Sequence, residues 1–161
     1  MQGEFIIMSV AVKLRAADIA DYFIWLANDI GSFVSNLKLQ KLVYYAQAWH
    51  LALYDCPLFD EDFQAWIHGP VIPELFEKYE HFGWQPINSD VHPDLPSTIV
   101  KHLEQVADEY FSCDAYLLEK MTRAELPWQQ ARGDLSVTEP STTIIRKEWM
   151  QKYYNAHVEE N

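Results

Sequence analysis

The stretch LKLQKLVYYAQAWHLALYDCPLFDEDFQAWIHGPVIPELFEKY, from Leu37 to Tyr79, decides the fold of this chain. Its first half places apolar residues on two faces of a helical wheel, and a helix with that pattern is normally buried between layers. Ser35 or Asn36 can cap this helix, which is expected to extend to about Tyr54. We therefore predict a central, buried helix.

The second half of the stretch predicts a short strand followed by a turn. Residues 63–68 alternate with the period of two that is typical of a half-buried strand. Gly69 and Pro70 are expected to end this strand in a structural turn, because glycine permits unusual backbone angles and proline fixes the next one. The role of this pair is interpreted as architectural.

Helical spacing and capping residues predict further helices on both sides of this block. They are expected at about 16–28, 73–82, 97–111, 114–124 and 147–156, with a short helical turn at 127–128 and an ordered loop at 85–96. The β-branched segment 142–145 is expected to pair with the first strand. The predicted class is mainly α (α+β), a helical bundle around a central buried helix with a small two- or three-stranded antiparallel sheet.

The length of 161 residues suits a single domain with one substantial core, and the 49% hydrophobic content argues against disorder. We divide the chain into an N-terminal extension at 1–15, one domain at 16–156 and a frayed tail at 157–161. Met1 and Met8 are both candidate start residues of the protein. Because only one domain is expected, a single folded unit is expected to carry the function.

The net charge of −12 arises beyond residue 50, where eight basic residues face twenty acidic ones. Nucleic-acid binding depends mainly on Lys and Arg that neutralise phosphates, so this balance disfavours direct contact with DNA or RNA. The acidity either serves solubility alone or attracts a basic partner protein.

The two cysteines, Cys56 and Cys113, form no CxxC pair. Their number and spacing argue against a disulfide framework or a structural zinc site and fit a reducing compartment. No run reaches the roughly 18 apolar residues that a membrane span requires, and the start MQGEFIIMSVAV lacks the basic region of a signal peptide. The expected location is the cytoplasm, with no membrane partner.

The histidines are the candidates for an enzymatic site. His50 or His68 could act as a general base with nearby carboxylates, since a histidine pKa is readily tuned near neutrality. For His50, a hydrogen-bonded structural role is the alternative. Cys56 follows both a helix C-terminus and Asp55, which oppose a thiolate. Metal-ligand spacings and phosphate-cradling glycine loops are absent from the sequence, so we assign no catalytic residue, no metal ligand and no cofactor.

Lys38 and Lys41 share one face of the central helix with Tyr45 and Trp49. Cations in the first turns of a helix are disfavoured by its dipole by about 0.3–1 kcal/mol each. Either they pair with acids from the C-terminal two-thirds of the chain, or the four residues form an exposed stripe that binds a partner. Aromatic residues are favoured interface anchors, and Trp66 is a further candidate anchor.

Four segments resemble the Panacea domain family, which includes SocA-like antitoxins and GepA-like phage-associated proteins and was formerly a domain of unknown function. They occur in the expected order and read LKLQKLVYYAQAWHLA (37–52), PLFDEDFQAWIHGPVIPELFEKY (57–79), ELPWQQAR (125–132) and IIRKEWMQKYY (144–154). The resemblance implies a non-enzymatic interaction protein. Its implied partner is the cognate toxin protein of a bacterial or prophage toxin–antitoxin pair.

The resemblance leaves two modes of neutralisation open, direct inhibition of the toxin or its delivery to a cellular protease. The residues themselves leave two other function classes open. One is a small cytoplasmic enzyme built on His50 or His68. The other is a transcription regulator, which would need a basic helix face that the sequence offers only around Lys38 and Lys41.

Overall fold

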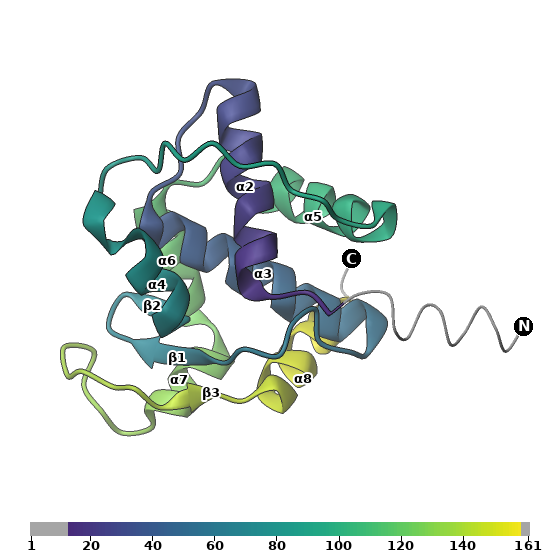
Figure 1. Ribbon diagram of the computed structural model, residues 1–161. Helices are drawn as coiled ribbons and strands as arrows, with labels where there is room; N and C mark the ends of the chain where they lie inside the picture. The colour runs from purple at the N-terminus through teal and green to yellow at the C-terminus, as the bar shows by residue number, and fades with distance from the viewer. Residues whose placement is uncertain (1–12, 159–161) are drawn as a thin grey trace, which may run out of the picture.

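A computed structural model describes residues 13–158 of the chain and places one helix, α3 (Asn36–Tyr54), at the centre of the molecule (Figure 1). Ser35 caps α3, its hydroxyl accepting a hydrogen bond from the backbone N–H of Lys38 at 3.3 Å. Most of its side chains are buried. The prediction of a central buried helix is therefore confirmed.

The other helices surround α3. They are α2 (Ala16–Ile30), α4 (Pro73–Tyr79), α5 (Ser97–Tyr110), α6 (Ala115–Ala124), α7 (Leu126–Arg132) and α8 (Lys147–Val158), with a short 3₁₀ turn, η1 (Glu80–Phe82), after α4. In Figure 1, α2 crosses in front of α3, α5 lies above it and α8 below it. Because α2, α5, α6 and α8 all pack on α3, apolar residues are needed around its whole circumference.

The small sheet has three antiparallel strands in the order β2-β1-β3, namely β1 (Phe63–Trp66), β2 (Gly69–Val71) and β3 (Ile144–Ile145). The predicted pairing of the 142–145 segment with the first strand is confirmed, with Phe63 opposite Ile145. The prediction that Gly69 and Pro70 end the strand is wrong. Residues 67–68 form the turn, and Gly69 and Pro70 begin the returning strand β2. Proline is tolerated there because β2 is an edge strand.

Helix boundaries agree with the sequence except at a few ends. Gly31 stops α2 in the left-handed conformation, with φ 67°. Asp114 caps α6 by accepting the Leu117 N–H at 2.8 Å, whereas Ser97 is the first helical residue of α5 and does not cap it. Helix α8 continues to Val158 and α2 to Ile30, each two residues further than expected. Helix α7 extends over Leu126–Arg132, where only a short turn at 127–128 was expected. Residues 1–12, which include both candidate starts, and residues 159–161 lie outside the described part of the chain.

Buried polar side chains of α3 hold the segments around it. Gln47 accepts the backbone N–H of Leu58 at 2.7 Å and donates to the carbonyl oxygen of Phe59 at 2.8 Å. Gln40 accepts the N–H of Ile72 at 3.0 Å. Buried polar groups are normally paired, and here the partners are backbone groups of the loop before β1 and of the segment before α4. The central helix thus positions both flanks of the sheet.

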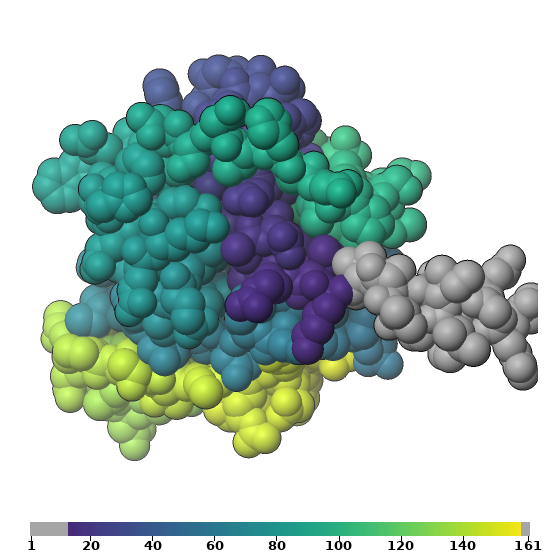
Figure 2. Space-filling model, in the orientation of Figure 1, coloured from purple at the N-terminus to yellow at the C-terminus, as the bar shows by residue number. Residues whose placement is uncertain are grey.

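The segment 85–96 lies over α2 (Figure 2). It is anchored at one end by a hydrogen bond from the Ile87 N–H to the Val34 carbonyl at 2.9 Å. The Asn28 amide donates to the Ser89 carbonyl oxygen at 3.0 Å further along. This contact explains how a segment rich in proline forms an ordered loop. Among the helices of residues 13–158, none combines the length and apolar character that crossing a bilayer demands.

Candidate functional site

The predicted stripe on α3 is mostly inside the protein. Tyr45 and Lys41 have 0% and 1% of their surface exposed, and Lys38 is also buried. Trp49 and Trp66 keep partly exposed side chains. The expectation of an exposed stripe is therefore wrong, because α5, α6 and α8 enclose the face of α3 that carries it.

The two lysines pair with backbone carbonyl groups rather than with acids. Lys38 Nζ donates to the carbonyl oxygen of Phe111 at 2.6 Å and lies 4.5 Å from the centre of the Phe111 ring. Lys41 Nζ donates to the carbonyl oxygen of Pro70 at 3.3 Å. Burial lowers the pKa of Lys41 to about 7, and the negative charge of Glu119 offsets only part of that effect. Lys41 is thus a buried amine that is readily deprotonated.

Tyr45 belongs to a buried network around Glu125, the residue that precedes α7. Its hydroxyl donates to both carboxylate oxygens of Glu125 at 3.1 Å, and the Tyr154 hydroxyl donates to the same carboxylate. The Tyr45 ring stacks on Tyr110, with 3.9 Å between ring centres. Burial raises the pKa of Glu125 to about 7, although the two hydroxyl groups lower it. The network joins α3, α5, α7 and α8.

The raised pKa of Glu125 predicts a pH-dependent cost that Glu125→Gln removes. The pKa of Glu125 rises from 4.5 to about 7 on folding, so the folded protein binds the carboxyl proton more tightly than the unfolded chain does. The stability that this proton contributes is complete below pH 4.5 and is lost as the pH rises through 7. We expect the variant to be more stable than the parent at pH 8, by about 2 kcal/mol, and no more stable at pH 4. Urea unfolding at the two pH values measures the difference. A constant difference between them would contradict a titrating Glu125.

The indole groups of Trp49 and Trp66 bond within the protein but remain at its surface. Trp49 Nε1 donates to the Tyr110 hydroxyl at 2.7 Å, and Trp66 Nε1 donates to the Gln64 side chain at 2.8 Å.

Gly69 has φ 103°, and a Cβ there would lie 2.8 Å from Lys41 Cε. The architectural role of this glycine therefore comes from the close approach of Lys41, as well as from the backbone angle.

The two candidate histidines do not form one site. His50 is buried, with Nδ1 2.8 Å from the carbonyl oxygen of Cys56, as its structural reading expects. His68 is exposed, with Nδ1 3.1 Å from a carboxylate oxygen of Glu119. Within residues 13–158, no group of three His, Cys, Asp or Glu residues is placed to hold a metal ion. Of these two histidines, His50 contacts a backbone carbonyl group and His68 contacts a carboxylate, that of Glu119.

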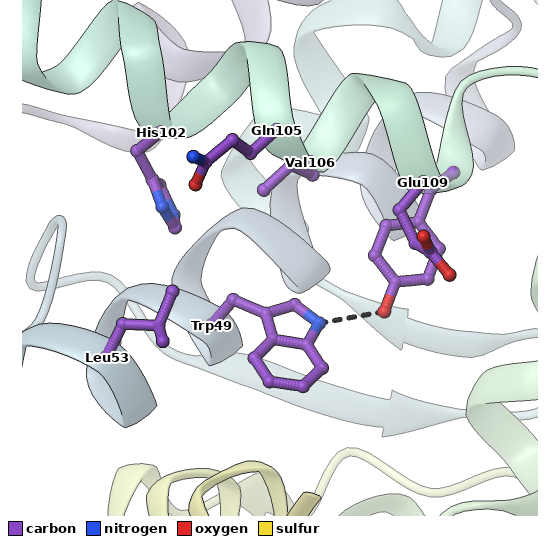
Figure 3. A pocket seen from close by; sticks show the side chains of 7 residues that line it. Trp49, Leu53, His102, Gln105, Val106 and Glu109 are labelled. Atoms are coloured by element: carbon purple, nitrogen blue, oxygen red, sulfur yellow. Dashed lines mark hydrogen bonds between the residues drawn. The ribbon is translucent and has the colours of Figure 1, made fainter. Parts of the chain in front are cut away.

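A groove of about 240 Å³ lies between α3 and α5 (Figure 3). Trp49 and Leu53, one helical turn apart, form its α3 side. The α5 side is formed by His102, Gln105, Val106, Glu109 and Tyr110. In Figure 3 the imidazole of His102 and the Leu53 side chain lie at one end, and the Glu109 carboxylate lies at the other. The groove combines an apolar middle with polar ends.

His102 is the buried polar residue of this groove. Its Nε2 lies 2.9 Å from the Ala46 carbonyl oxygen, and its Nδ1 has no hydrogen-bond partner among the described residues. Burial lowers the pKa of His102, and the neighbouring His50 lowers it further. The sequence did not reveal this site, because the residue pattern of α3 does not show that α5 packs against it. One pattern could have indicated it: Gln105 and Glu109 lie four residues apart, on one face of α5, as Trp49 and Leu53 do on α3.

A comparison with known protein families matches residues 39–129 to the family described as antitoxin SocA-like, Panacea domain. This match covers more than half of the chain. The protein belongs to the SocA-like Panacea family. The resemblance seen in the sequence is thereby confirmed. The Panacea match extends from the first turn of α3 into α7, and it contains every residue that lines the groove. No curated protein and no solved structure matched the chain.

Proposed function

We propose that this protein is an antitoxin that binds and neutralises a cognate toxin protein encoded beside it, without being an enzyme itself. The observation that carries this proposal is the match of residues 39–129 to the antitoxin SocA-like Panacea family. The toxin pair would be bacterial or prophage-borne, and its site of action the cytoplasm. Neutralisation would occur by direct inhibition, or by delivery of the toxin to a cellular protease.

The charge of the chain supports a basic toxin as the partner. A net charge of −12 attracts positively charged proteins and accelerates their association at low ionic strength. The same charge disfavours direct binding to nucleic acid, so we do not retain the transcription regulator. Among the residues first considered for partner binding, we retain Trp49 and Trp66 as contacts, since both remain partly exposed.

Co-expression with the neighbouring open reading frame tests the proposal. We expect the neighbour to arrest growth when induced alone, and growth to resume when this protein is induced with it. The toxin protein should also be retained on a column that carries the tagged antitoxin. A neighbour that is harmless alone, or lethal in both conditions, would contradict the proposal. Toxin abundance, followed in cells with and without their proteases, separates delivery for degradation from direct inhibition.

A further inference from the structure

We propose that the groove between α3 and α5 receives an arginine side chain of a basic protein partner. The inference rests on the proposed function, because it identifies how this protein would recognise its toxin. It assigns a site and a ligand chemistry to a groove that shares only Trp49 with the stripe predicted on α3. Three properties of the groove support it, namely its shape, its unpaired acceptor and its charge.

The shape of the groove suits one long side chain. Its volume is about 240 Å³, and its lining includes the apolar groups of Trp49, Leu53 and Val106. Arginine carries an aliphatic stem that packs on such a surface while its charged head stays near water. The guanidinium group is also planar and stacks favourably on an indole ring. Trp49 provides that ring at the surface of α3.

The acceptor that we assign to the ligand is Nδ1 of His102, a buried and unpaired atom of a residue that lines the groove. A carbonyl oxygen can only accept, so the contact with Ala46 places the imidazole hydrogen on Nε2 and leaves Nδ1 with a free lone pair. An unpaired buried acceptor costs about 1–3 kcal/mol, which an incoming N–H donor would recover. The exposed Gln105 side chain lies beside the ring in Figure 3. Because Nδ1 itself is buried, we infer that this exposed side chain changes its rotamer when a ligand binds.

The charge of the groove favours a cationic ligand. Glu109 contributes an exposed carboxylate at the outer end, and the groove lining contains no lysine or arginine. Guanidinium has five N–H donors, so one group can serve His102 Nδ1 and the Gln105 carbonyl oxygen together. A lysine ammonium would lack the planar shape that stacks on Trp49. Arginine therefore matches the groove best.

Binding of a short peptide tests the groove without any toxin. We would titrate the full-length, ¹⁵N-labelled protein with acetyl-Ala-Arg-Ala-amide and follow the His102 Nδ1 resonance. We expect a saturable shift with the arginine peptide and at least a tenfold weaker effect with its citrulline counterpart, which keeps the shape but lacks the charge. Absence of a saturable shift at about 10 mM peptide would overturn the inference, because fragments of this size bind in the millimolar range.

Two variants separate the groove from general electrostatics. Gln105→Lys places the protein's own cation beside His102 and should abolish the shift at Nδ1. Glu104→Lys lies on the same helix outside the groove lining and changes the net charge by twice as much. It should leave peptide affinity within about twofold, because exposed charges outside the site are screened by salt. Equal loss in both variants would show a non-specific charge effect and overturn the inference.

The same variants, tested against the toxin, distinguish failure of the groove from failure of the proposed function. If the parent rescues growth and folded Gln105→Lys does not, while Glu104→Lys does, the groove is the toxin contact. If the parent and Gln105→Lys rescue growth equally, the antitoxin function stands and the groove inference is wrong. If the parent itself fails to rescue growth, the proposed function is wrong. Should Gln105→Lys fail to fold, the peptide titration of the parent protein still decides the inference.

Discussion

Replacing Lys41 with methionine is expected to stabilise the protein by about 3 kcal/mol below pH 7. Lys41 is 1% exposed, and its pKa falls from 10.5 to about 7 on folding. Keeping its ammonium group charged in the folded protein therefore lowers the free energy of unfolding. Methionine fills a similar volume without a charge. The hydrogen bond to the Pro70 carbonyl oxygen is lost, which costs about 1 kcal/mol and leaves a net gain.

The pH dependence identifies Lys41 as the cause. Between pH 7 and 10.5 the unfolded chain binds the lysine proton more strongly than the folded protein does, so stability rises with pH across this window. The advantage of Lys41→Met should therefore be greatest below pH 7 and disappear near pH 10.5. Unfolding by urea across this range measures it. The tyrosines with raised pKa values affect parent and variant alike, so their contribution cancels in the difference.

Lys38→Met serves as the matched control. It makes the same substitution one turn earlier in α3, at a lysine whose ammonium donates a 2.6 Å bond to Phe111 and lies over its ring. We expect no gain in stability there and a loss of about 1 kcal/mol, because a strong bond is removed from a less buried position. Stabilisation of equal size in both variants would show that the burial of Lys41 has no special effect.

Gly69→Ala is expected to destabilise the fold by about 3 kcal/mol. The added Cβ would lie 2.8 Å from Lys41 Cε and 2.9 Å from Thr122 Oγ1, both of them in buried side chains. The backbone at φ 103° is also unfavourable for alanine. Because β2 would be pushed away from α3 and α6, we expect the midpoint of urea unfolding to fall while the protein remains folded without denaturant.

Gly31→Ala is the control for backbone strain alone. Its φ is 67° and its ψ 32°, and a Cβ there meets nothing within 4 Å. We expect a loss of about 1 kcal/mol, the cost of a left-handed conformation for alanine. If the two variants lose equal stability, the close approach of Lys41 to residue 69 adds nothing to the cost of the alanine substitution. A combined Gly69→Ala and Lys41→Ala variant should recover part of the loss, since it removes the clash with Lys41 Cε while the one with Thr122 Oγ1 stays.

Several elements could be predicted because their cause is local. Apolar residues on two faces marked α3 as buried, and Ser35 and Asp114 marked the starts of α3 and α6 through their capping hydroxyl and carboxylate. Alternation over residues 63–68 predicted the first strand, which in the structure ends at Trp66. The placement of Gly69 and Pro70 was wrong for a physical reason. Both residue types suit a turn and an edge strand, and only pairing with β1 distinguishes the two.

The sequence by itself determined the helical class, the buried central helix and membership of the Panacea family, because these depend on residue order and on periodicity within a single element. The tertiary structure alone decided which side chains reach the surface. Lys41 and Tyr45 look like an exposed stripe until α5, α6 and α8 cover them, whereas His102 and Glu109 form a groove only once α5 lies against α3. Burial and contact between distant segments arise from packing, and a single helical wheel carries no information about the neighbour that will cover each face.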